Sequence, residues 1–419
     1  MRFFNDIKNK IKDEYRVIDV LPSAILVLSF FLGGLREFNE WTVFTVMFIG
    51  IVILFRNKIS IRKAGLWAVF ALWILISIFF SHVPLESFWQ FAKYILFILF
   101  LGLTASREEL SLKIWVFVVF SFALLSAIIV FHQAPNFNLP LPNNPNYTAA
   151  FLAACAAALV LIIISVHSIR ERFYSGVLLI TFFAAIISLR SRGALLAFFI
   201  VSMLILIHRK YYRAFVFSLI LILVGIILMP QELLGEILKI YDPNAFQRLN
   251  IWRVALEGTY LYPIWGYGAG GFEKLFAQLK FPAYDGLSYF GHYGRHAHSE
   301  ILNIASTSGI IAAFIFMAAF VKSLKFKSKS NIYTDIAKVF AITVFCQSCL
   351  DVIFYSGSLN LLFFGSLGFI ASSSNFKNNQ KTDKTRNIIL FLSAFVLVTS
   401  LLIKQNYNNL CVRKLIDMP

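Results

Sequence analysis

Basic residues and histidines stand at several places where an apolar chain has little reason to carry them. Arg190 and Arg192 lie in the short segment Leu189-Arg-Ser-Arg-Gly193 between two apolar stretches. A guanidinium group is a planar fork that binds a phosphate through two hydrogen bonds. We interpret the pair as an anion site. The alternative is that both arginines snorkel to lipid headgroups.

A histidine cluster offers a group that can move a proton near neutral pH. His292, His296 and His298 fall within the segment Gly291-His-Tyr-Gly-Arg-His-Ala-His-Ser-Glu300. Imidazole suits the work of a general base. Two other interpretations stay open: a zinc site, although no Cys or carboxylate stands at a familiar ligand spacing, and a structural role in helix capping.

A third group of polar residues lies on a predicted helix. Arg248 and Trp252 are four residues apart, and Arg253 follows directly, after an Asp242-Pro-Asn segment that is typical of a helix start. We expect this helix to present its arginines and indole to a substrate. The alternative is a solvated amphipathic helix.

Two charged residues lie in or near apolar segments. Lys93 is inside the segment 87–104, and Asp351 is near the end of 336–354. A charge within a membrane span is costly and usually faces a cavity. Lys93 either adds to a basic cluster with the arginines or snorkels outward. Asp351 is expected to be its counter-ion or to orient an arginine.

Three further motifs have plain structural interpretations. The glycine-rich segment Pro263–Phe272 lacks the strand and helix of a dinucleotide loop, so we expect a tight loop pressed to the membrane face. Cys346 and Cys349 form a C-x-x-C in an apolar helix and indicate helix packing. Asn143–Asn146 reads as a turn, with hydrogen bonding to a sugar as the alternative.

The composition determines the class of protein that must position these residues. Of 419 residues 59% are hydrophobic and only 14% are charged, and mean hydropathy is +0.76. These values exclude a soluble globular enzyme and a disordered chain. The net charge of +17 would suggest nucleic acid in a soluble protein, but here it indicates cytoplasmic loops of a membrane protein. Four cysteines are too few for a disulfide framework.

The apolar segments predict an all-α polytopic membrane protein with about 12–13 transmembrane helices and one long periplasmic loop carrying short helices. The first span is expected to be a retained anchor. The predicted spans are 17–35, 39–55, 64–80, 87–104, 113–131, 147–167, 174–189, 193–208, 212–229, 299–321, 336–354, 358–373 and 387–403.

The distribution of Lys and Arg predicts the orientation. With the N-terminus in the cytoplasm, the inner segments hold 25 of the 38 basic residues. The C-terminal tail is then outside with thirteen spans and inside with twelve. We divide the chain into an N-terminal transmembrane bundle (1–229), a periplasmic loop (230–298) and C-terminal transmembrane helices (299–419). A loop this long is usually functional.

Arginines, a lysine and a histidine at the outer membrane face indicate a reaction that needs anion stabilisation and one base. The sequence has no Walker loop and no D-x-D carboxylate pair. A lipid-pyrophosphate sugar donor fits, with arginines neutralising the departing pyrophosphate in place of a metal ion. A polysaccharide transporter or flippase is an alternative, although transporters place polar sites at the midplane on broken helices.

The order and spacing of these motifs resemble those of bacterial O-antigen ligases, in the ligase/polymerase superfamily of C-type membrane glycosyltransferases. His298-Ser299, nine residues and Gly309 resemble the H-[N/S/Q]-x9-G signature. Ser191-Arg-Gly193, Arg248…Trp252 and Pro263…Gly266-x-Gly268 are similar as well. Ala312 stands where the full signature has Gly, Thr or Tyr, which leaves an O-antigen or capsule polymerase open.

The resemblance implies transfer of a polysaccharide from undecaprenyl pyrophosphate to lipid A–core at the periplasmic face of the inner membrane. It implies an inverting displacement without metal or cofactor, and neither it nor the residues point to nucleic acid. His298 would be the base, and Arg192 and Arg248 the pyrophosphate clamps. To these we add Arg190 and Lys93 from their location. The expected substrate-binding residues are Arg190, Lys93, Trp252, His296 and Arg253.

Overall fold

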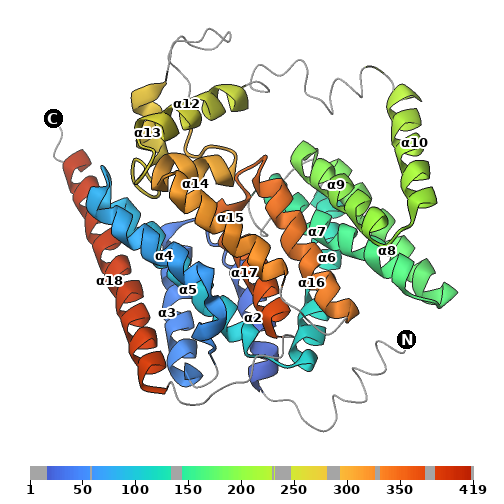
Figure 1. The fold of residues 1–419 in the computed structure, drawn as a ribbon, viewed down its shortest axis with the longest axis horizontal. Coiled ribbons are helices and arrows are strands. Elements are labelled where there is room, and N and C mark those ends of the chain that lie inside the picture. The colour runs from blue at the N-terminus through green and yellow to red at the C-terminus, as the bar shows by residue number, and fades with distance from the viewer. Residues whose placement is uncertain are drawn as a thin grey trace.

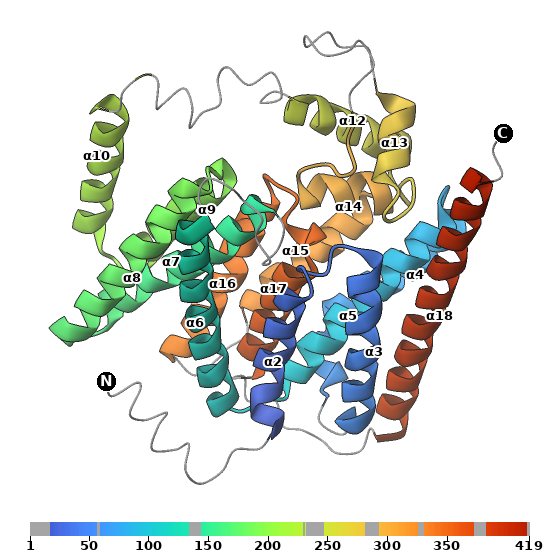
Figure 2. The same ribbon diagram turned by 180° about the vertical axis from the view of Figure 1, so that it is seen from behind.

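A computed structural model describes residues 17–56, 59–133, 144–228, 231, 247–280, 293–325, 331–372 and 383–416. All regular elements in these ranges are helices (Figures 1 and 2). The predicted all-α membrane fold is therefore confirmed, and α12 and α13 are the short helices expected in the long loop.

The first half of the chain forms a bundle of apolar helices. Its elements are α2 (Val17–Phe31), α3 (Phe38–Leu54), α4 (Leu66–Ser77), α5 (Pro84–Ala105), α6 (Glu109–Gln133), α7 (Pro145–Ser165), α8 (Ile169–Ser188), α9 (Arg192–His208) and α10 (Tyr212–Leu228), with the 3-10 turns η2 (Ile61–Ala64) and η3 (Ile78–Phe80) beside α4.

The second half adds two short helices and returns to the bundle. Its elements are α12 (Gln247–Leu261), α13 (Phe272–Leu279), α14 (Glu300–Ser308), α15 (Ile310–Leu324), α16 (Ile332–Ser348), η5 (Ile353–Tyr355), α17 (Gly357–Ser372) and α18 (Asp383–Ile416). Each predicted span overlaps a helix, although 336–354 extends past the end of α16 at Ser348, and one span is not a single helix. The span 299–321 is wrong as a single helix, because the chain breaks at Gly309 into α14 and α15.

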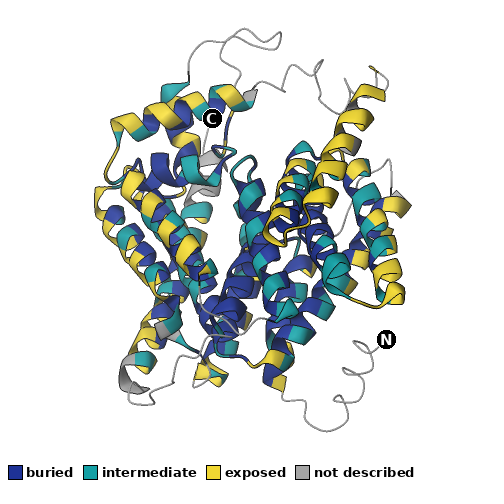
Figure 3. Cartoon of the chain, turned by 45° about the vertical axis from the view of Figure 1, so that its right-hand side comes forward, coloured by how far each residue is buried: buried dark blue, intermediate teal, exposed yellow. Residues whose placement is uncertain are grey.

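The helices carry the surface expected in lipid. Five are long and apolar enough to cross a membrane, namely Pro84–Ala105, Glu109–His132, Pro145–Ser165, Ile169–Ser188 and Arg386–Asn409, and further apolar helices are 10–17 residues long. Large apolar side chains such as Ile180, Phe217 and Phe391 are exposed on the outer helices (Figure 3). Apolar side chains on the outside are stable only against hydrocarbon, so the chain is a multi-pass membrane protein.

The centre of the bundle is built around α7 and α17. The buried part of α7 from Ala149 to Ala158 consists of small residues apart from Phe151 and Leu152, and α8, α9 and α16 pack against this helix. Small residues let helix backbones approach closely, which strengthens dispersion contacts where lipid offers no hydrophobic drive. Helix α17 is buried from Gly357 to Ala371 and packs on α5.

The contacts of two basic residues identify one end of the bundle. At one end, Lys63 donates to the carbonyls of Ala105 and Ala371 at 3.0 and 3.1 Å, at the ends of α5 and α17. At the same end Arg209, after α9, pairs with Asp335 in the first turn of α16. The starts of α5 and α9 and the end of α16 lie at the other end. We name the end with Lys63 and Arg209 the basic end and the opposite end the site end.

Helix α18 runs from the basic end to the site end. Lys404, in its second half, lines the cavity at the site end. Helix α2 starts at the opposite end of the bundle from the last turn of α18 (Figure 2). Opposite ends imply an odd number of passes, as in the thirteen-span alternative.

The glycine-rich loop and the break at Gly309 form one junction by backbone hydrogen bonds. Ile310 N–H donates to Pro263 O at 2.9 Å, and Gly268 N–H donates to Thr307 O at 2.8 Å. A Cβ on Gly309 would lie 1.8 Å from the Ile264 carbonyl oxygen, and its φ of 90° is unfavourable for other residues. Glycine at 309 is thus required by the approach of the loop.

Aromatic stacking fixes the same loop to the bundle. The Trp265 ring stacks on Trp73 with centroids 4.8 Å apart and on Phe80 at 4.4 Å. Both partners belong to the site end of α4 and η3. The expected tight loop is present, and it packs on the site end of the bundle.

We expect Gly309→Ala to destabilise the fold. Holding a non-glycine residue at this φ costs about 1–3 kcal/mol before the steric clash is added. The measurement is the melting temperature of the purified protein in detergent. Gly176→Ala is the matched control, because Gly176 lies in α8 with open space around it, and a melting temperature equally lowered in both variants would contradict the junction.

Candidate active site

A buried carboxylate at the site end joins two of the predicted catalytic residues. Asp351 is 4% exposed. Arg248 Nη2 donates to its Oδ2 at 3.1 Å, and His298 Nδ1 lies 3.2 Å from its Oδ1. These residues are 103 and 53 positions from Asp351 in the sequence. The expectation that Asp351 orients an arginine is confirmed, and the expectation that it pairs with Lys93 is wrong.

Backbone groups hold this cluster in place. Arg248 Nη1 also donates to Leu350 O at 3.1 Å, and Val352 N–H donates to Asp351 Oδ1 at 2.8 Å. Trp252, one turn after Arg248 on α12, donates its indole N–H to His298 O at 3.4 Å. The Arg248…Trp252 spacing therefore serves to fix both Asp351 and the histidine segment.

His298 sits in a strained backbone conformation directly before α14. Its φ is 49°, a region that few residues other than glycine occupy. The contacts from Trp252 and Asp351 hold it there. Such strain persists where surroundings over-determine the position, and it is common at functional sites. With Nδ1 turned to Asp351, Nε2 is the nitrogen left for a substrate.

The arginine pair lies at the start of α9, next to Asp351. A Cβ built on Gly193 would be 3.9 Å from Asp351 Cβ and 3.7 Å from Gln347 Cγ. Arg192 is the first residue of α9 and is partly buried, whereas Arg190 is exposed in the turn with a φ of 51°. The structure thus brings the Arg192 backbone to the Asp351 cluster, together with the N-terminal dipole of α9.

The electrostatics of Asp351 favour a charged carboxylate. Burial alone would raise its pKa, but the hydrogen bond from His298 and the charge of Arg248 outweigh burial and hold the pKa below its usual value. An ionised Asp351 stabilises the Nδ1–H tautomer of His298 and the positive charge that develops when Nε2 accepts a proton.

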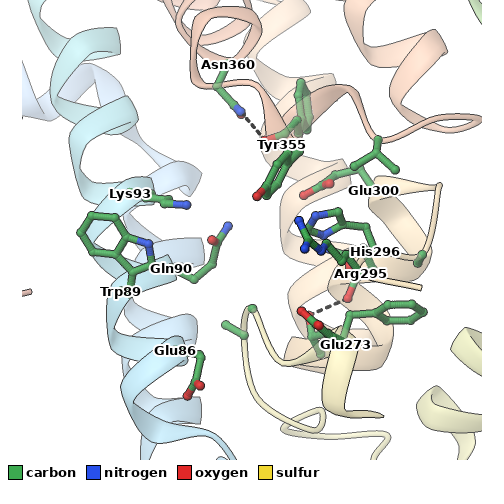
Figure 4. A pocket seen from close by; sticks show the side chains of 18 of the residues that line it. Glu86, Trp89, Gln90, Lys93, Glu273, Arg295, His296, Glu300, Tyr355 and Asn360 are labelled. Carbon is green, nitrogen blue, oxygen red and sulfur yellow. Dashed lines mark hydrogen bonds between the residues drawn. The ribbon is translucent and has the colours of Figure 1, made fainter. Parts of the chain in front are cut away.

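A cavity of about 390 Å³ opens beside His298. In Figure 4 one wall is α5, with Glu86, Trp89, Gln90 and Lys93. The facing wall carries Arg295, His296, Glu300 and Tyr355. The lining is polar on both walls, so the cavity fits a hydrophilic substrate group.

Lys93 faces this cavity. Its Nζ lies 4.9 Å from the ring centroid of Trp41 and 5.2 Å from that of Trp89. Lys93 shares the cavity wall with Arg36 and Lys404, whereas Arg190 and Arg192, the arginines with which it was expected to cluster, are not among the lining residues.

His296 also lines the cavity, and its ring lies 4.3 Å from that of Tyr355. Burial is the main cause that lowers its pKa to about 3, and the positive charges of Lys93 and Arg295 add to it. His296 is therefore neutral at physiological pH.

The remaining predicted residues lie elsewhere. Arg253 is exposed on α12 and is not among the residues lining the cavity. His292 lies outside the described residues. Among the residues that the structure does describe, no three His, Cys, Asp or Glu side chains are grouped as metal ligands. Cys346 and Cys349 are free thiols packed against the core, as predicted.

Several residues of the site were not singled out from the sequence. Glu300 and Asn303 follow His298 on α14, and Glu300 accepts a hydrogen bond from Tyr94 on α5 at 3.4 Å. Gln347 Oε1 and Ser191 Oγ are buried beside Gly193 and Asp351 without a hydrogen-bond partner in the described ranges. Glu300, Asn303 and Gln347 are polar residues within apolar segments, and this feature of the sequence could have identified them.

Residues 176–317 match the family model of O-antigen ligases. This part of the chain is therefore similar to the O-antigen ligase family. The matched O-antigen ligase domain contains Arg192, Arg248 and His298, whereas Asp351 lies beyond its end. No curated protein matches the sequence. The resemblance seen in the motifs is confirmed, and it assigns a glycosyltransferase of the O-antigen ligase/polymerase type.

We expect His296 to make the fold acid-sensitive. Between its usual pKa of 6.5 and the folded value of about 3, the unfolded chain takes up a proton that the buried imidazole does not. The free energy of unfolding therefore falls as the pH is lowered through this window. The measurement is the melting temperature in detergent across this pH range. We expect it to fall less steeply with decreasing pH in His296→Phe than in wild type. Parallel curves for the two proteins would contradict this account.

Proposed function

We propose that the protein transfers a glycan from undecaprenyl pyrophosphate to an acceptor hydroxyl at the periplasmic face of the inner membrane. His298 Nε2 takes the acceptor's proton as its oxygen attacks the anomeric carbon. The bond from that carbon to the pyrophosphate oxygen breaks, and its electron pair leaves with the pyrophosphate. Attack opposite the leaving group inverts the anomeric carbon.

The observation that carries this proposal is the shared carboxylate of Asp351. One oxygen holds the imidazole that accepts a proton, and the other holds the guanidinium that faces the leaving anion. A base and an anion-stabilising group held by one buried residue keep a fixed separation. Such preorganisation is what stabilises a transition state in which charge moves from acceptor to leaving group.

Arginines supply the electrostatic stabilisation of the pyrophosphate. Arg248 uses two of its five N–H donors on Asp351 and Leu350. The others remain for phosphate oxygens. Arg192 and the N-terminal turn of α9 lie close by. This arrangement can neutralise the leaving group without a metal ion.

The distribution of Lys and Arg along the sequence supports a periplasmic site. Basic residues collect on the cytoplasmic side of membrane proteins. The basic end holds Lys63 and Arg209, and the cavity lies at the other end. The alternative of a flippase is disfavoured because the polar groups gather at one end of the bundle rather than at its middle.

Lipid A–core is the acceptor that the ligase resemblance favours. A polymerase, which extends a second lipid-linked glycan, is the other candidate. Ala312 does not decide between them, because it is fully buried in α15 and fills a packing position.

Deletion of the protein followed by gel analysis of lipopolysaccharide tests the function, with re-expression of His298→Asn. Asn tolerates a positive φ and still hydrogen-bonds to Asp351, but it cannot accept the proton. We expect loss of all long-chain bands, with lipid-linked polymer accumulating, in both strains. Core bearing one repeat would indicate a polymerase, and a normal band pattern with His298→Asn would refute the base.

We expect Asp351→Asn to lower kcat by about 10²–10⁴-fold, the scale for losing the carboxylate that orients a catalytic histidine. The acceptor KM should change little, because Asp351 does not line the cavity. Rates with purified protein and lipid-linked donor provide the measurement. A raised KM with unchanged kcat would assign Asp351 to substrate binding instead.

We expect Arg248→Ala and Arg192→Ala each to reduce kcat by about 10²–10³-fold, as for the loss of one preorganised donor. Arg→Lys should restore little, because a lysine lacks the planar fork. Arg209→Ala at the basic end is the control and should leave kcat unchanged. Full activity of both lysine variants would show that charge alone suffices.

A further inference from the structure

One wall of the cavity is formed by basic and indole side chains, which we call the cation–indole wall: Arg36, Trp41, Trp89, Lys93 and Lys404. They come from the turn before α3, from α3 itself, and from α5 and α18. The Lys93 ammonium group is in cation–π contact with both indole rings. The indole faces favour its positive charge and hold its ammonium group at the cavity surface.

The positive charges of this wall have no acidic partner in the described part of the chain. No described carboxylate lies within ion-pair distance of Arg36, Lys93 or Lys404. Lys93 and Lys404 are near enough to repel one another. Bringing like charges together in a half-enclosed cavity is unfavourable unless an anion joins them.

The carboxylates that also line the cavity are engaged elsewhere. Glu86 binds Lys274 at 3.0 Å. Glu300 accepts from Tyr94, and Glu273 accepts from Tyr293. Glu37 caps the first turn of α3. The carboxylates around the cavity therefore have partners of their own, whereas Arg36, Lys93 and Lys404 have no described carboxylate within ion-pair distance.

Polar atoms around the same cavity lack a hydrogen-bond partner within the described ranges. Trp41 is 2% exposed and its Nε1 is unsatisfied. The same holds for Arg36 Nε, His296 Nε2 and Asn303 Oδ1, all in buried positions. A buried polar atom without a hydrogen-bond partner is energetically unfavourable. Several of them around one cavity indicate a polar ligand with both donors and acceptors.

We propose that the cation–indole wall binds a phosphoryl group on the acceptor substrate. This inference rests on the proposed function and names the chemistry of its acceptor. A phosphate monoester carries a charge near −1.5 to −2 and strong acceptor oxygens. It matches a point charge at Lys93 and a guanidinium at Arg36 better than a neutral sugar does.

The position of the wall explains how such a group would aid the reaction. His298 and Ser299 line the same cavity, and Figure 4 shows Lys93 directed toward the wall that carries His296 and Glu300. An acceptor held by its phosphoryl group at Lys93 presents its sugar to the side of the cavity where the imidazole lies. Anchoring of this kind lowers the entropic cost of aligning the hydroxyl.

Two acceptors carry this chemistry. One is a phosphorylated sugar of lipid A–core, as a ligase requires. The other is the pyrophosphate of a second lipid-linked glycan, as a polymerase requires. Both place an anion beside the cavity, and they differ in the lipid that bears it.

The test is binding without turnover, measured by native mass spectrometry on the full chain in detergent. The probes are lipid A–core, the same material after phosphatase treatment, and undecaprenyl pyrophosphate. We expect Lys93→Gln and Arg36→Gln each to weaken one phosphate-bearing probe at least tenfold. Lys93→Arg should retain most binding, because it keeps the charge. Lys322→Gln, in the last turn of α15, is the matched control.

The pattern across variants identifies the acceptor. Weaker binding of untreated lipid A–core in Lys93→Gln, with undecaprenyl pyrophosphate lost only in Arg248→Ala, supports a ligase. Two undecaprenyl pyrophosphates per chain, one lost in each variant, support a polymerase. Binding in Lys93→Gln and Arg36→Gln equal to that in Lys322→Gln would overturn the proposal. Absence of transfer by wild type with the binding pattern intact would instead overturn the proposed function alone.

Discussion

The site depends on one buried negative charge. Asp351 is almost without solvent, and a carboxylate there is stable only because Arg248 and His298 compensate for lost hydration. The requirement works in both directions. Removing the carboxylate would leave a guanidinium and an imidazole without a partner, so the three residues form a unit whose geometry follows from electrostatics rather than from any single helix.

That unit needs two loops and two helix ends to meet. Asp351 follows α16, Arg248 lies on α12, and His298 precedes α14. The junction at Gly309 supplies the mechanical link, because it binds the Pro263–Gly268 backbone to the end of α14. Two motifs separated in the sequence are therefore one structural feature, and their glycines are required by close backbone approach.

The helices could be predicted from the sequence, but the pairing within the site could not. Long apolar runs leave a helix as the stable backbone in lipid, so their positions follow from composition. The break at Gly309 was missed because Ile310 and its neighbours continue the apolar pattern, and only contact with the Ile264 carbonyl reveals the cost of a helix there. The sequence predicts that Asp351 pairs with Lys93 or orients an arginine. It indicates that a buried carboxylate needs a cationic partner, but it does not identify which cation lies within ion-pair distance.

Lys and Arg side chains have different roles at the two ends of the bundle. At the basic end, Arg209 binds Asp335, and Lys63 binds carbonyls at helix ends. At the site end, Arg248 balances Asp351, whereas Lys93 rests on indoles with no described acid beside it. A cation without a counter-ion inside a membrane bundle is energetically costly. The energetic cost of placing Lys93 here is best explained by an anion that binds reversibly, as a substrate does.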